Sequence, residues 1–216
     1  MRVLRTIVVA LAVSFCGAAC TSYIPTYYYG INTEPGVKLA ANPYPFTIEL
    51  RSLRAPSRYK DQMVYRTAEY RVGFYEYSQW VEPPAEMVGR ALLNALKDSK
   101  LFVRVDPVGA ILAPDLVLQG NITGFDQVVG EKAETAVCEM DLEIVPGAGG
   151  RPVWNYTAKA TVEQKEKGAA GFVPAMVAAV DEAILKAIGA MEASTELREF
   201  AAEKKEPTVT PTATAR

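Results

Sequence analysis

Apolar and polar residues alternate along several stretches of the chain, a pattern that predicts β-strands with one buried face. Residues 46–53 alternate in this way, with Phe46 and Ile48 on the apolar side. The longest alternation covers 137–145, and another covers 154–162 after a Pro-Gly-Ala-Gly-Gly turn. Because only one side of each stretch is apolar, we expect the last two strands to pair antiparallel, with their other face in water.

Four further stretches have the composition and length of strands. They cover residues 62–67, 69–78, 101–105 and 115–125. A single residue separates the first two, so we expect them to form a hairpin. The second strand of that hairpin is rich in tyrosine and phenylalanine.

Two stretches have apolar residues at helical spacing instead. The first begins at Pro83-Pro84, since proline is tolerated in the first turn of a helix, and it ends near Lys100. The second helix is predicted over residues 171–200. The apolar positions of the first helix are Met87 or Val88, Ala91, Leu92, Ala95 and Leu96.

The predicted order of elements is three strands, a helix, four strands and a helix (β-β-β-α-β-β-β-β-α). This order indicates an α+β domain with a mainly antiparallel sheet and two helices packed on one face. We place the domain at residues 46–202. The Lys, Glu, Pro, Thr and Ala residues of 203–216 cannot bury a core and are predicted to be disordered.

The N-terminus has the three parts of a secretory signal peptide, predicted over residues 1–19. Two arginines precede an apolar run over 7–15, and small residues follow it. The letters GAAC, which end at Cys20, resemble a bacterial lipobox, and this implies covalent acyl and diacylglycerol groups on Cys20. The alternative is an ordinary signal peptide with an incidental cysteine. Thr21 resembles the sorting pattern of the outer membrane, so we expect a lipid anchor there and a domain that faces the periplasm.

Residues 20–45 are predicted to form a lipidated tether, because Asn, Pro and Gly are scattered along them. Three consecutive tyrosines, Tyr27 to Tyr29, are unusual in a linker. They are expected to form an extra edge strand on the domain, or to lie near lipid headgroups, where amphipathic rings are favourable.

The composition excludes several classes of function. The 216-residue chain contains no histidine, so it cannot build a Ser-His-Asp or Cys-His relay or a histidine metal site. A net charge of −2 argues against nucleic-acid binding. Glu139, Asp141 and Glu143 share one side of a predicted strand, but the alternation already explains them as solvent-facing, with Lys132 and Lys159 as ion-pair partners. We therefore predict no enzyme activity, no catalytic residue, no metal site and no cofactor besides the lipid on Cys20.

The hairpin and the loop after it hold the residues that we predict to contact a protein partner. Aromatic residues and arginine are typical anchors of protein interfaces. The alternative is that most of these rings belong to the core and stack on the first helix. The predicted partner-binding residues are Tyr65, Arg66, Tyr75, Tyr77, Trp80, Pro83 and Pro84.

With the lipobox and the tyrosine-rich segment, two further stretches resemble the ABC-type transport auxiliary lipoproteins. They read MVYRTAEYRVGFYEYSQWVEPPAEMVGRALLNALKDSKLF and LVLQGNITGFDQ, and the resemblance spans about residues 20–195. It implies an accessory subunit that is anchored in the outer membrane and docks on the MCE component of a lipid-transport system. The alternative function is a periplasmic carrier that holds acyl chains itself. Homo-oligomerisation is also plausible for a lipoprotein that matches a ring-shaped partner.

Overall fold

The computed structural model describes residues 24–68 and 71–205. The predicted signal peptide, Cys20 and residues 206–216 lie outside the described residues, as do Glu69 and Tyr70. The strands are β1 (Tyr27–Tyr29), β2 (Tyr44–Leu50), β3 (Gln62–Ala68), β4 (Arg71–Trp80), β5 (Phe102–Pro107), β6 (Leu116–Val129), β7 (Glu134–Pro146) and β8 (Trp154–Glu163). The helices are α2 (Pro84–Ser99), α3 (Gly168–Ala193) and α4 (Thr195–Lys205).

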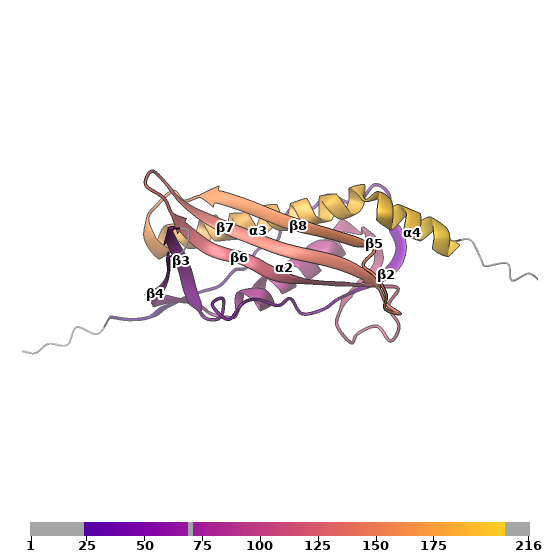
Figure 1. Ribbon diagram of the computed structural model, residues 1–216, viewed down its shortest axis with the longest axis horizontal. Coiled ribbons are helices and arrows are strands. Elements are labelled where there is room, and N and C mark those ends of the chain that lie inside the picture. The colour runs from indigo at the N-terminus through magenta and orange to yellow at the C-terminus, as the bar shows by residue number, and fades with distance from the viewer. Residues whose placement is uncertain (1–23, 69–70, 206–216) are drawn as a thin grey trace, which may run out of the picture.

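All of these strands belong to one curled sheet that is organised around β6. One edge of β6 pairs antiparallel with β7, which pairs antiparallel with β8. The other edge is shared between β2, which is parallel to the start of β6, and β3, which is parallel to its end. In Figure 1 the long strands β6, β7 and β8 run along the molecule, with β3 and β4 at one end and α4 at the other.

The prediction of a mainly antiparallel sheet is wrong, because the sheet is mixed. The β3–β4 hairpin and the β6–β7–β8 meander are antiparallel as expected. However, β2 pairs in parallel with both β5 and β6, and β1 pairs in parallel with β4. Parallel neighbours need a long crossover, and β3, β4 and α2 supply one between β2 and β5.

The first predicted helix is confirmed as α2, with Pro84 in its first turn. Its predicted stripe, Met87 to Leu96, is buried. The second predicted helix is instead two helices, with a break at Ser194, whose backbone is extended. The Ser194 hydroxyl accepts a hydrogen bond from the Leu197 N–H at 3.1 Å, so Ser194 caps α4 and favours a new helix start.

The helices divide their contacts among different strands. α3 contacts β7 and β8, α2 contacts β5 and α3, and α4 contacts β2. In the described part of the chain, α3 is the one helix long and apolar enough to cross a membrane by length and composition. Its buried stripe, from Phe172 to Met191, makes it a core helix of this domain. The packing of both predicted helices on a single face stays a prediction.

The segment predicted as a tether is packed on the domain over most of its length. Tyr27 to Tyr29 form β1, an edge strand beside β4, as the preferred alternative expected. Ile31 is buried, and the Ala40 N–H donates to the Ser99 carbonyl at 2.8 Å. The packed domain therefore begins at Tyr27 and not at Phe46. At the other end, α4 extends to Lys205, two residues beyond the predicted start of the disordered tail.

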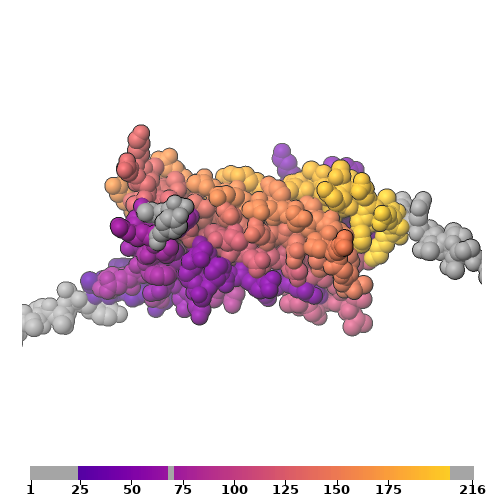
Figure 2. Space-filling model, viewed as in Figure 1, coloured from indigo at the N-terminus to yellow at the C-terminus, as the bar shows by residue number. Residues whose placement is uncertain are grey.

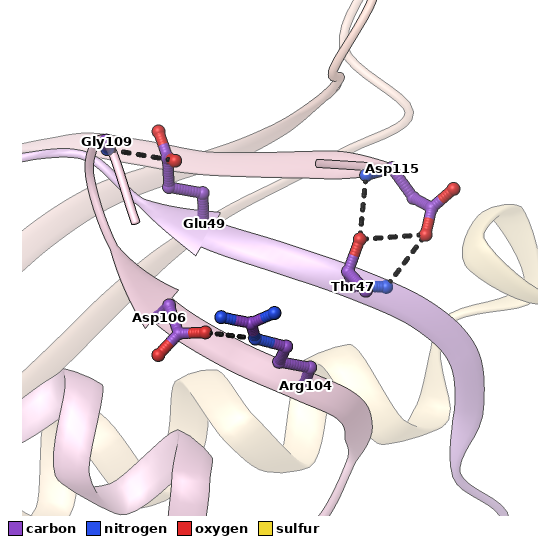
Figure 3. A network of polar contacts seen from close by, with 6 residues as sticks. All are labelled: Thr47, Glu49, Arg104, Asp106, Gly109 and Asp115. Carbon is purple, nitrogen blue, oxygen red and sulfur yellow. Dashed lines mark hydrogen bonds and ion pairs between the residues drawn. The ribbon is translucent and has the colours of Figure 1, made fainter. Parts of the chain in front are cut away.

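A polar network closes the loop between β5 and β6 onto β2 (Figure 3). The Asp115 carboxylate accepts hydrogen bonds from the Thr47 N–H and hydroxyl, both at 2.9 Å, and the Gly109 N–H donates to Glu49 at 3.0 Å. Lys204 forms an ion pair with the other oxygen of Asp115, so α4 is tied to the same corner. Phe200 of α4 lies on the Phe46 ring of β2, with ring centroids 5.5 Å apart.

Acid is expected to weaken the attachment of α4. Burial alone raises the pKa of Asp115, but the hydrogen bonds from Lys204 and Thr47 hold it below its ordinary value. A carboxyl group with a lowered folded pKa stabilises the fold fully above its unfolded pKa, about 3.9 for Asp, and that contribution disappears as the pH falls below this value. The loss should be under about 1 kcal/mol, because the pair is partly exposed.

Urea unfolding of the wild type and of Asp115→Asn between pH 6 and pH 3 would measure this contribution. The wild type should lose more stability on acidification than the variant. Equal losses would show that Asp115 does not hold α4.

Candidate functional site

The structure turns most of the predicted partner-binding residues inward. Trp80 is 2% exposed, and its ring meets Phe125 edge-on at 5.4 Å between centroids and lies 5.9 Å from the ring of Phe172. Pro84 is buried in the first turn of α2, and Pro83 is half-buried before it. Trp80 and Pro84 are therefore not available to a partner, and the alternative that assigned these rings to the core holds for Trp80.

Arg66 faces a buried carboxylate. Its Nε atom lies 2.6 Å from Oδ2 of Asp126, whose side chain is 3% exposed, whereas the Arg66 side chain is 36% exposed. The Tyr59 hydroxyl donates to the other oxygen of Asp126. Burial, and next the hydrogen bond to Asp126, raise the pKa of Tyr59 above its usual value of 10.0. Asp126 of β6 is thus joined to β3 through Arg66 and to the loop before β3 through Tyr59.

Tyr65 and Tyr75 pack on each other across the hairpin, with their rings edge-on at 5.5 Å. Gly73 makes room for Tyr65, because a Cβ atom on Gly73 would lie 2.3 Å from the Tyr65 ring. The Tyr75 hydroxyl donates to the buried Gln127 amide oxygen at 2.7 Å. Burial raises the pKa of Tyr75, which keeps the hydroxyl a hydrogen-bond donor. Both tyrosines are half-buried, and their main contacts stabilise the hairpin.

Of the seven predicted residues, Tyr77 is the one that projects into solvent as expected. Its side chain is 37% exposed, and its hydroxyl donates to the neighbouring Glu76 carboxylate at 2.8 Å. That hydrogen bond raises the pKa of Tyr77.

Exposed apolar side chains gather on β1, β4 and the residues next to them. Seven of the twelve large apolar residues that are exposed in the described chain lie there. We call this set the β1–β4 patch; it consists of Ile24, Tyr27, Tyr28, Val72, Phe74, Tyr77 and Val81. In Figure 2 the purple residues of this part of the chain are gathered at one end of the molecule, away from the yellow α4. Exposed large apolar side chains gathered on one part of a domain are typical of interaction sites.

The sequence did not single out Val72, Phe74 and Val81 as contact residues. Phe74 and Val72 lie opposite Val64 and Arg66 on β3, and alternation alone would place them on a buried face. Their exposure follows from the position of the hairpin at the end of the sheet. Of the additional exposed residues, the tyrosines of β1 had a signal in the sequence through their unusual repetition, and Phe74 had one in the aromatic richness of its strand.

The carboxylates of β7 are used within the sheet. Glu139 pairs with Lys159 at 2.7 Å, and chiefly this interaction lowers the pKa of Glu139. Asp141 accepts a hydrogen bond from the Thr157 hydroxyl at 2.7 Å. Within residues 24–68 and 71–205, no group of three or more His, Cys, Asp or Glu side chains is placed to hold a metal ion. Cys138 is fully buried, and burial raises the pKa of its thiol to about 12, so this thiol is not a nucleophile at neutral pH.

A shallow apolar groove of about 260 Å³ lies beside the first half of α2. It runs between α2 and the ends of β2 and β5, and its apolar lining includes Leu50, Leu53, Ala85, Leu93 and Val108. A wider groove of about 710 Å³ lies at the α4 end and is lined by Leu112, Asp115, Phe200 and Lys204, among others. Both are open at the surface.

The sequence profile of the ABC-type transport auxiliary lipoprotein component matches residues 29–186, which is most of the described domain. The chain belongs to the ABC-type transport auxiliary lipoprotein family. The family consists of auxiliary lipoprotein components of ABC-type transport and is not a known enzyme family. A membrane-anchored place in the cell envelope follows from it.

Two solved structures share the fold of this auxiliary lipoprotein. One is a protein from Xanthomonas campestris, with a TM-score of 0.65 and 15% identity, and the match covers 82% of this chain and 98% of that one. The other is an uncharacterized protein, with a TM-score of 0.55 and 15% identity, and the match covers 84% of this chain and 99% of that one. No curated protein sequence matches the chain. At these identities the two structures support the fold alone.

Proposed function

We propose that this auxiliary lipoprotein is anchored in the outer membrane through Cys20, faces the periplasm, and docks on the MCE component of an ABC-type lipid-transport system. Family membership supplies the transporter. The resemblance described above is the reason for proposing an MCE component as the partner. The GAAC sequence that ends at Cys20 is the reason for proposing a lipid anchor. The protein contributes binding and placement, while ATP hydrolysis and lipid passage belong to its partners.

The β1–β4 patch is the observation that carries the docking role. Its β4 side chains, Val72, Phe74 and Tyr77, are exposed large apolar groups. The strand that carries them pairs with β3 from Arg71 to Phe74 and with β1 from Ser78 to Trp80. Burial of such side chains at the centre of an interface supplies most of the binding energy of a typical complex. The docking surface therefore moves from the seven predicted residues to Tyr77 and its exposed neighbours.

The interior favours docking over the carrier alternative. A carrier needs room for acyl chains between sheet and helix. Phe172, Met176 and Ile184 of α3 and Phe125 and Met140 of the sheet fill that space with side chains that have no exposed surface. These residues form a closely packed core.

Loss of the exposed β4 side chains is expected to abolish partner binding without unfolding the domain. Each anchor residue at an interface centre is worth about 2 kcal/mol or more, so Phe74→Ser/Tyr77→Ser should weaken binding by about 100-fold or more. Recovery of the MCE-domain protein with the affinity-tagged lipoprotein from solubilised envelopes, identified by mass spectrometry, measures this effect.

Val103→Ser/Leu185→Ser is the matched control, because Val103 and Leu185 are exposed apolar residues on β5 and α3. The control should recover the MCE-domain protein as the wild type does. If the wild type recovers no MCE-domain protein, the proposed partner is wrong. If the Phe74/Tyr77 variant recovers as much as the wild type, the docking surface is wrong.

A further inference from the structure

The packing of the N-terminal segment leaves a short connection to the proposed anchor. Seven peptide units join Cys20 to Tyr27, the first residue of β1. Fully extended, they span at most about 25 Å. The 25 peptide units of the tether predicted over residues 20–45 would have spanned roughly 85 Å. Because β1 is hydrogen-bonded to β4, a lipid on Cys20 holds the β1–β4 end of the domain close to the membrane.

The residues at this end suit a lipid headgroup region. Tyr27 and Tyr28 are exposed, Tyr28 at 65%, and Ile24 just before them is exposed as well. Tyrosine has an apolar ring and a polar hydroxyl, and this combination favours the boundary between water and hydrocarbon. An acyl anchor already holds the protein at the membrane surface, so the tyrosine rings do not have to recruit it from solution. Even a weak affinity of these rings for the headgroup region is then enough to orient the domain.

The rest of the molecule extends away from this end. Figure 1 shows the indigo start of the described chain at one end of the long axis and α4 at the other. The loop residue Leu112 lines the groove beside α4, and it is fully exposed. A domain held at β1 therefore presents its α4 end at the greatest distance from the anchor.

We propose that Ile24, Tyr27 and Tyr28 form a membrane-facing surface that rests among the lipid headgroups, with the α4 end directed away from the membrane. This orientation rests on the proposed lipid at Cys20. It also implies that a partner meets Phe74 and Tyr77 directly beside the membrane surface.

Tryptophan fluorescence in vesicles tests the orientation. The acylated full-length mature protein carries Tyr28→Trp, and a matched variant carries Leu112→Trp. Each is reconstituted in vesicles of phosphatidylethanolamine and phosphatidylglycerol, whose brominated acyl chains quench a tryptophan that lies among the lipids. The native Trp80 and Trp154 are buried, so the wild type supplies the background. Val81→Trp is a second probe that keeps both native tyrosines, since the Val81 N–H donates to the Tyr29 carbonyl of β1 at 2.8 Å.

We expect the emission from position 28 to shift to the blue and to lose most of its intensity, with partial loss at position 81 and none at position 112. Co-flotation with the vesicles but no quenching at positions 28 and 81, or equal quenching at position 112, would overturn the membrane-facing surface and leave the anchor intact. If the protein does not co-float and mass spectrometry finds no acyl group on Cys20, the anchor itself is wrong.

Discussion

Replacing Trp80 with alanine is expected to lower the free energy of unfolding by about 3–5 kcal/mol, which is a large share of the stability of a domain of this size. The Trp80 ring joins β4 to β6 through Phe125 and to α3 through Phe172. Its removal leaves a cavity where three elements meet, and the backbone of β4 cannot close it while the hairpin stays paired. Chemical denaturation followed by circular dichroism measures the loss.

Tyr77→Ala is the control, because Tyr77 lies on the same strand and is exposed. It should change the stability by less than about 0.5 kcal/mol. The two variants should differ in the opposite way in the affinity recovery from envelopes. Trp80→Ala, at a temperature where it is still folded, should recover as much MCE-domain protein as the wild type does, whereas Tyr77→Ala should recover less. A Trp80→Ala variant as stable as the wild type would mean that Trp80 is not the core residue described above.

Replacing Arg66 with methionine is expected to cost about 3 kcal/mol, because it leaves the buried Asp126 carboxylate without a cation. Methionine preserves most of the aliphatic stem, so the change removes charge more than volume. Asp126→Leu should cost less than Arg66→Met, since Arg66 is partly exposed and can turn toward water when its partner is gone.

Replacing the whole cluster provides the control. Arg66→Met/Asp126→Leu/Tyr59→Phe removes every member of the buried polar group, and such replacements are often neutral or stabilising. The triple variant should therefore be closer to the wild type than Arg66→Met is. If Arg66→Met alone is neutral, Arg66 does not pair with Asp126 in solution and is again a candidate contact for the partner.

The local elements could be predicted because they follow from periodicity. The alternation over 137–145 and 154–162 predicted β7 and β8, and both strands pair as expected. The stripe of the first predicted helix is the buried stripe of α2. In each of these elements one face is buried and the other is wet, so the local pattern carries the information.

The strand partners could not be predicted in the same way. Periodicity states which side of a strand is buried but not which strand lies beside it. Besides β7, which follows it in the chain, β6 pairs with β2 and β3 from distant parts of the chain. The break at Ser194 depends on one hydroxyl cap within a continuous apolar stripe. The prediction of one helix over 171–200 missed this break because apolar residues at helical spacing continue beyond Ser194 to Leu197, which is buried.

The exposure of the hairpin side chains could not be predicted from the sequence either. Aromatic composition singled out the hairpin, yet exposure depends on what covers each side chain. Trp80 is covered by α3 and β6, and Arg66 is turned toward Asp126. Phe74, on the same strand as Trp80, stays 44% exposed. The sequence therefore indicated this part of the surface, and only the fold separates its exposed residues from its core.

Site-specific photo-crosslinking in intact cells tests whether the β1–β4 patch docks on an MCE-domain protein. A photoreactive phenylalanine analogue replaces Tyr77 in one lipoprotein and Val103 in another, since both positions are exposed and apolar but only Tyr77 belongs to the β1–β4 patch. We expect a crosslink from position 77 to an MCE-domain protein and none from position 103. A crosslink to that protein from position 103 alone, or no crosslink to it from either position, would show that the β1–β4 patch does not dock on it.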